Sequence, residues 1–118
     1  MLTNADIAEL TALRREIHHA PELSGQEYGT AQMLAGLMRD LRADEVLTEI
    51  GGTGVLAGFH SAEPGPSVMF RAELDALPML EAEGAAHRAA IDGSAHLCGH
   101  DGHMVGLVGL ARLIARVR

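Results

Sequence analysis

The chain has 118 residues and a formal net charge of −7, and 47% of its residues are hydrophobic. This length fits one domain with its own core, and the acidic balance argues against a nucleic-acid partner. A single cysteine excludes an internal disulfide, which small secreted domains commonly need. The first twenty residues contain no signal peptide and no membrane-spanning run, so we expect a cytoplasmic protein without membrane contact.

Two helices are predicted in the first part of the chain. Apolar residues recur at helical spacing over residues 4–19, where Asn4 is placed to cap the helix. Ser24 and Glu27 match a capping box, in which each side chain bonds the backbone N–H of the other residue. A second helix should therefore follow them and end near Arg42.

Short apolar segments then predict three strands, over residues 46–50, 55–59 and 67–72, of which the third is apolar enough to be central in a sheet. Residues 73–97 have weak periodicity, and long loops in compact domains are usually functional or disordered. Residues 101–117 predict a final helix that is apolar almost all round and should be buried on more than one side. This order of elements predicts an α/β fold.

Potential metal ligands crowd into eight residues before the final helix: His96, Cys98, His100 and His103, with Asp101 as a fifth. Imidazole and thiolate together suit Zn²⁺ or another borderline transition metal. On an extended segment Cys98 and His100 would point the same way, because side chains alternate with a period of two. The stretch therefore predicts a metal site.

Other interpretations of these residues remain open. Cys98 is alternatively a small buried hydrophobe, or a nucleophile with His100 or His103 as its base, although parallel side chains converge poorly on one proton. Glu73 and Asp75 leave the predicted third strand, and ligands gather at the carboxyl ends of strands in open α/β sheets. Each is a candidate carboxylate that fixes a ligand, or a surface charge.

Four motifs in order resemble the M20 peptidases, in the branch of aminoacylases, hippurate hydrolases and auxin-conjugate hydrolases. They are RREIH (14–18) with PELS (21–24) and Glu27, GTGV (52–55), RAELDALP (71–78) and LCGHDGH (97–103). The resemblance covers essentially the whole chain. It implies that residues 1–118 are the N-terminal portion of the metal-binding catalytic domain, a partial α/β/α domain of a zinc-peptidase-like fold with helices packed on a mixed sheet.

The resemblance implies a metal-dependent amidohydrolase that cleaves N-acyl amino acids or related amide and peptide bonds. Its complete site holds two divalent metal ions, with Zn²⁺ or Mn²⁺ expected and Co²⁺ or Ni²⁺ as alternatives. Matched residue by residue, Cys98 and His100 stand at metal-ligand positions. Glu73 stands where most relatives have an aspartate that orients the site. No ligand role is carried onto His103 or Asp101.

The same resemblance places other parts of the site outside the matched motifs. Relatives supply a general base from a Glu-Glu pair, further metal ligands, and a lid domain that often mediates dimerisation; this sequence contains no Glu-Glu dipeptide. We therefore expect the 118-residue chain alone to be inactive and to self-associate through exposed apolar surface and an unpaired sheet edge. The alternative is a non-catalytic metal-binding or interaction module on the same fold.

Overall fold

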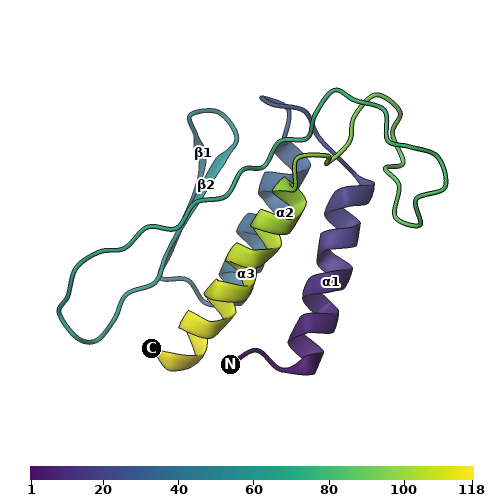
Figure 1. The fold of residues 1–118 in the computed structure, drawn as a ribbon. Coiled ribbons are helices and arrows are strands. Elements are labelled where there is room, and N and C mark those ends of the chain that lie inside the picture. The colour runs from purple at the N-terminus through teal and green to yellow at the C-terminus, as the bar shows by residue number, and fades with distance from the viewer.

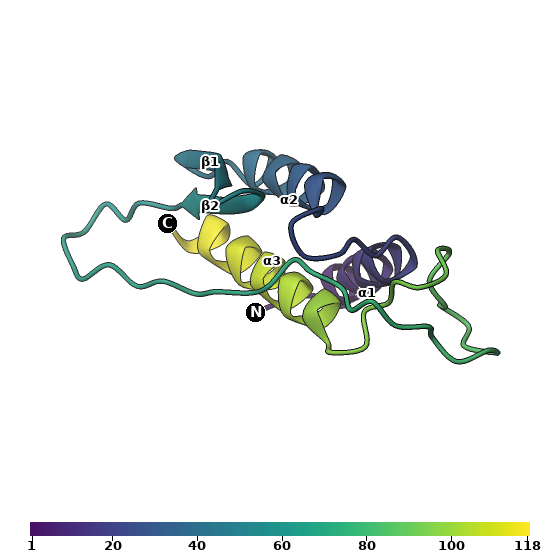
Figure 2. The same cartoon turned by 90° about the horizontal axis from the view of Figure 1, so that it is seen from above.

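The computed structural model describes residues 1–118. Its elements in chain order are α1 (Asn4–His19), α2 (Tyr28–Asp40), β1 (Glu45–Ile50), β2 (Gly54–Gly58) and α3 (His100–Val117). Helix α3 packs between α1 and α2, and the β1–β2 hairpin lies against α2 (Figure 1). Seen from above, the long connection between β2 and α3 loops out first at one end of the packed helices and then at the other (Figure 2). Three helices and a two-stranded sheet confirm the α/β class.

Helix α1 has the predicted bounds, but Thr3 caps it, not Asn4. The Thr3 hydroxyl accepts a hydrogen bond from the Asp6 backbone N–H at 3.1 Å, and the Asp6 carboxylate accepts one from the Thr3 N–H at 2.7 Å. These reciprocal bonds form a capping box. Asn4 is already inside the helix, so its side chain cannot serve at the cap position.

The capping box predicted for the second helix is wrong. Ser24 lies in a turn, and α2 begins only at Tyr28, with no side-chain hydrogen bond from Glu27 at the cap position. The carboxylate of Glu22 serves the helix start instead and accepts from the backbone N–H of Gly29 at 3.0 Å. Ser24 itself makes no side-chain hydrogen bond to the start of α2.

The hairpin agrees with the predicted strands to within one residue, and its strands pair antiparallel. The third strand predicted over residues 67–72 is wrong, because no backbone segment of the chain pairs with it. Its side chains Val68, Met69 and Phe70 are 71%, 80% and 57% exposed instead of buried. The sheet within these residues is therefore two-stranded and antiparallel, not mixed. Self-association through this exposed apolar segment stays a prediction.

The core lies where the three helices meet. It contains Leu10 and Ile17 of α1, Leu34 and Met38 of α2, and Met104, Val105, Val108 and Ala111 of α3. Helix α3 contacts both other helices, as its apolar sequence predicted. None of the helices combines the length and apolar character needed to cross a bilayer. The packing fixes the first turn of α3 beside the end of α1, and this is where the candidate site lies.

Candidate metal centre

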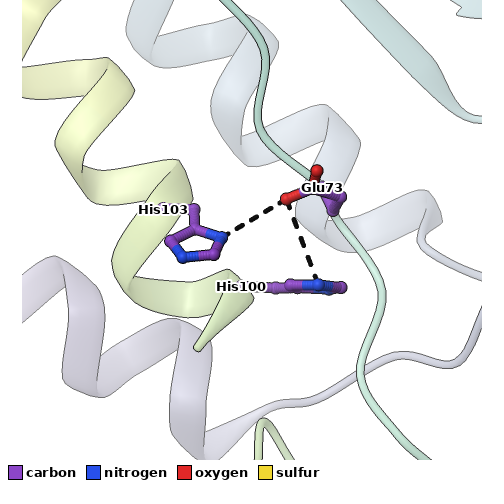
Figure 3. Close-up of side chains that lie close together, drawn as sticks. All are labelled: Glu73, His100 and His103. Atoms are coloured by element: carbon purple, nitrogen blue, oxygen red, sulfur yellow. Dashed lines mark hydrogen bonds and ion pairs between the residues drawn. The ribbon is translucent and has the colours of Figure 1, made fainter. Parts of the chain in front are cut away.

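A carboxylate and two imidazoles meet at the N-terminal end of α3 (Figure 3). His100 and His103 lie on its first turn, three residues apart and hence on the same side of the helix, and Glu73 comes from the extended segment that passes this end. Glu73 Oε2 is 3.3 Å from His103 Nδ1 and 4.0 Å from His100 Nε2. The potential ligand atoms of the three residues all lie within 4.8 Å of one another.

The His100 ring is oriented by Asp75. Its Nδ1 lies 2.8 Å from the Asp75 carbonyl oxygen and 3.1 Å from the Asp75 carboxylate. Because both partners are acceptors, Nδ1 carries a proton and donates, which leaves Nε2, on the side of Glu73, as the nitrogen that would bind a metal ion. An imidazole held in this way by its second nitrogen is typical of metal-binding histidines.

The charge of Glu73 also suits it to bind a metal ion. Its Oε1 accepts from Arg71 at 3.0 Å, and Arg71, followed by His103, holds the pKa of Glu73 below its usual range. The carboxylate is therefore ionised at neutral pH. Ligand atoms at about 2.0–2.2 Å from one Zn²⁺ lie at most about 4.4 Å apart, so the cluster needs only a small side-chain movement to surround an ion. The three donors fit a divalent metal ion.

The other predicted ligand, Cys98, is a free, exposed cysteine outside this group. Gly99 separates it from His100 and adopts a left-handed conformation with φ of 88°. The expected alternation of residues two apart holds only for extended backbone, and this turn interrupts it. Cys98 as a ligand stays a prediction. His103 was among the potential ligands predicted from the sequence, but the family resemblance gave it no ligand role.

His96 lies inside the protein instead of in the cluster. Only 4% of its surface is exposed, and neither ring nitrogen makes a hydrogen bond. Burial lowers the pKa of His96 and keeps the ring neutral.

On the other side of the first turn of α3, Asp101 is buried against α1. Its Oδ2 accepts from His18 Nδ1 at 2.8 Å and from Arg14 Nε at 3.0 Å. Burial opposes ionisation of Asp101, but the hydrogen bond from His18 and the charge of Arg14 outweigh it and lower the pKa of this carboxyl. Sequence reasoning gave His18 no part in the site. The sequence signal for such a role was its position one helical turn after Arg14, which places both side chains on the same side of α1, beside Ile17, which is buried.

No protein-family model matches the chain. Over 110 residues the chain is 39% identical to the provisionally named amidohydrolase YhaA of Bacillus subtilis, a match that covers 93% of this chain and 28% of YhaA. It is 33% identical over 118 residues to the N-acetylcysteine deacetylase of the same organism, covering 100% of this chain and 31% of that enzyme. The crystal structure of Bacillus subtilis YxeP, a dinuclear metal-binding peptidase of the M20 family, superimposes with a TM-score of 0.91 at 34% identity, covering 99% of this chain and 33% of YxeP.

The fold of this chain is that of part of an M20-family metal-binding peptidase. The chain is homologous to M20-family amidohydrolases and peptidases over nearly its whole length, which confirms the resemblance carried by its four motifs. It spans about a third of the length of these three relatives, between 28% and 33%.

Proposed function

We propose that this chain forms the metal-binding part of a cytoplasmic, metal-dependent amidohydrolase that acts on N-acyl amino acids or related amides. The observation that carries the proposal is the convergence of Glu73, His100 and His103 from two separate segments. The N-acetylcysteine deacetylase, which matches the whole chain, supports the substrate class. Divalent metal ions supply such a site with a Lewis acid for the scissile carbonyl and with activation of water.

His100 belongs to both possible ligand sets. The family motif pairs it with Cys98, and the geometry groups it with Glu73 and His103. Only the first set contains sulfur, so a metal ion whose spectrum responds to thiolate distinguishes the two. Co²⁺ is such a probe, because thiolate ligands add a charge-transfer band in the near ultraviolet to its visible absorption.

Titration of the chain with Co²⁺ is expected to give visible bands that saturate. His100→Ala should weaken binding by more than about 100-fold, beyond the loss typical of residues that only orient ligands. Glu73→Gln should weaken it as well, because the amide cannot supply a negative charge. The control is His60→Ala, since His60 is exposed and its ring makes no hydrogen bond to the cluster.

The outcomes separate the ligand sets. A near-ultraviolet band that disappears in Cys98→Ser assigns the thiolate as a ligand. Its absence from the wild-type chain, together with weaker binding by His103→Ala, assigns the carboxylate–imidazole set. Binding that is unchanged in His100→Ala overturns the metal centre.

The 118-residue chain alone is expected to release no amino acid from N-acetyl amino acids at appreciable rate, with Zn²⁺ or Mn²⁺ added. Two ions need about three protein ligands each, more than this cluster supplies. Loss of a general base costs a further factor of roughly 10²–10⁴, and the Glu-Glu pair that provides it in relatives is not in this sequence. A turnover above about 1 s⁻¹ that His100→Ala removes would contradict this expectation. Metal binding without turnover also fits the alternative of a non-catalytic module.

A further inference from the structure

His18, near the end of α1, lies between two carboxylates that belong to different segments. Its Nδ1 is 2.8 Å from Asp101 Oδ2 on α3, and its Nε2 is 2.7 Å from Glu81 Oε1 in the loop between β2 and α3. The His18 side chain is 7% exposed and that of Glu81 10%. The imidazole therefore joins the start of α3 to the loop that precedes it.

Both ring nitrogens of His18 face oxygens that can only accept. A neutral imidazole donates from one nitrogen, so two such contacts require the doubly protonated ring. Burial alone would lower the pKa of His18, but the hydrogen bonds to Glu81 and Asp101 outweigh it and raise the pKa above its usual value. Glu81 has a lowered pKa, held down first by the Ala89 backbone N–H and then by His18. The result is a buried cation between two anions.

These two anions sit on the segments that carry the candidate ligands. Asp101 directly follows His100, and successive helical residues point about 100° apart, so Asp101 faces α1 and His100 faces Glu73. Glu81 follows Glu73 by eight residues and also fixes the loop, because its Oε2 accepts from the Ala89 N–H at 2.8 Å. His18 makes no hydrogen bond or ion pair with the three candidate ligands, yet it holds both of the segments that present them.

We propose that His18 is a positioning residue for the metal centre, which sets the distance between the Glu73 segment and the first turn of α3 by bridging Glu81 and Asp101. The inference rests on the proposed function, because it concerns the same cluster. A bridge of this kind brings the carboxylate and the imidazoles together before an ion arrives.

Three substitutions test the bridge by Co²⁺ titration of the full chain. His18→Asn places an amide near the Nδ1 position and keeps the bond to Asp101, and His18→Gln places one near Nε2 and keeps the bond to Glu81. Each should weaken Co²⁺ binding about tenfold and shift the visible bands, and His18→Ala should weaken it up to about 100-fold, the range for groups that orient ligands. If His18→Ala does not fold, the two amide variants carry the test.

Two controls separate positioning from stability. Leu10→Ala removes a core side chain eight residues earlier on α1 and should lower the melting temperature of the metal-free chain while leaving Co²⁺ affinity unchanged. His60→Asn removes an exposed histidine and should change neither quantity.

The possible results are distinguishable. A wild-type chain that binds Co²⁺ while folded His18 variants bind it equally well overturns the inference and leaves the proposed function intact. The inference is also overturned if Leu10→Ala weakens binding as much as the His18 variants do. A wild-type chain that binds no Co²⁺ overturns both.

Discussion

Replacement of Ile17 by alanine is expected to lower the free energy of unfolding by about 2–5 kcal/mol. Ile17 is 1% exposed and lies in the core where α1 meets α3. The substitution loses the transfer free energy of the removed carbon atoms and leaves a cavity that the neighbours fill only in part. Because natural domains have a total stability of about 5–15 kcal/mol, this is a large share. Urea denaturation followed by circular dichroism measures it.

Ile7 provides the matched control, since it is the same residue on the same helix. It is 52% exposed, so Ile7→Ala should change stability by no more than about 1 kcal/mol. Similar losses for both variants would contradict the burial of one face of α1 and place its core contacts elsewhere.

The helices and the hairpin were predictable because their signals are local. The apolar spacing over residues 4–19 relates residues that are only one helical turn apart, and the bounds of α1 agree with this pattern. The extended segment 67–72 was mispredicted because a strand also needs a hydrogen-bonded neighbour, which composition cannot supply. The cap of α2 failed for a similar reason, since Glu22 reaches the helix start from beyond the turn that holds Ser24.

The candidate site was predicted where its residues are close in sequence. His100 stood out by the crowding of histidine and cysteine, and Glu73 by the motif after the predicted strand. The contacts of His18 left no such pattern, because its partners Asp101 and Glu81 are 83 and 63 residues away. A side chain whose role depends on two distant anions is recognised only once the chain is folded.

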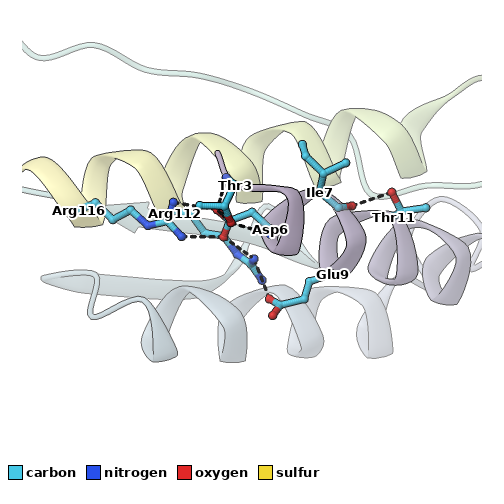
Figure 4. A network of polar contacts seen from close by, with 7 residues as sticks. All are labelled: Thr3, Asp6, Ile7, Glu9, Thr11, Arg112 and Arg116. Atoms are coloured by element: carbon cyan, nitrogen blue, oxygen red, sulfur yellow. Dashed lines mark hydrogen bonds and ion pairs between the residues drawn. The ribbon is translucent and has the colours of Figure 1, made fainter. Parts of the chain in front are cut away.

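The second large effect is expected from Asp6→Asn, which should lower the melting temperature by roughly 5 °C or more. The carboxylate of Asp6 links the start of α1 to the end of α3 (Figure 4). It accepts from Arg116 at 2.9 and 2.6 Å and from Arg112 at 3.2 Å, besides its bonds with Thr3. Asparagine keeps an oxygen for the helix cap but loses the charge that both guanidinium groups face. Thermal unfolding at neutral pH measures the change.

The pH dependence of stability tests whether the charge of Asp6 causes this loss of stability. The Arg116 guanidinium and the Thr3 N–H hold the pKa of Asp6 well below its usual range. Because the unfolded chain takes up this proton near pH 4 and the folded chain only at lower pH, the stabilisation is complete above about pH 4 and is lost as the pH falls further. The difference between wild type and Asp6→Asn should therefore shrink progressively as the pH is lowered below about 4.

Glu9 is the control for this measurement, because it also pairs with Arg112, at 2.8 Å, but its side chain is 66% exposed. Exposed ion pairs contribute little, so Glu9→Gln should lower the melting temperature by about 1 °C or less at any pH. A difference for Asp6→Asn that stays constant down to pH 3 would place the lost stability in packing or hydrogen-bond geometry that asparagine cannot reproduce, and not in the charge. A difference that shrinks with acid assigns it to the ionised carboxylate, and hence to the pairing of the two helix ends.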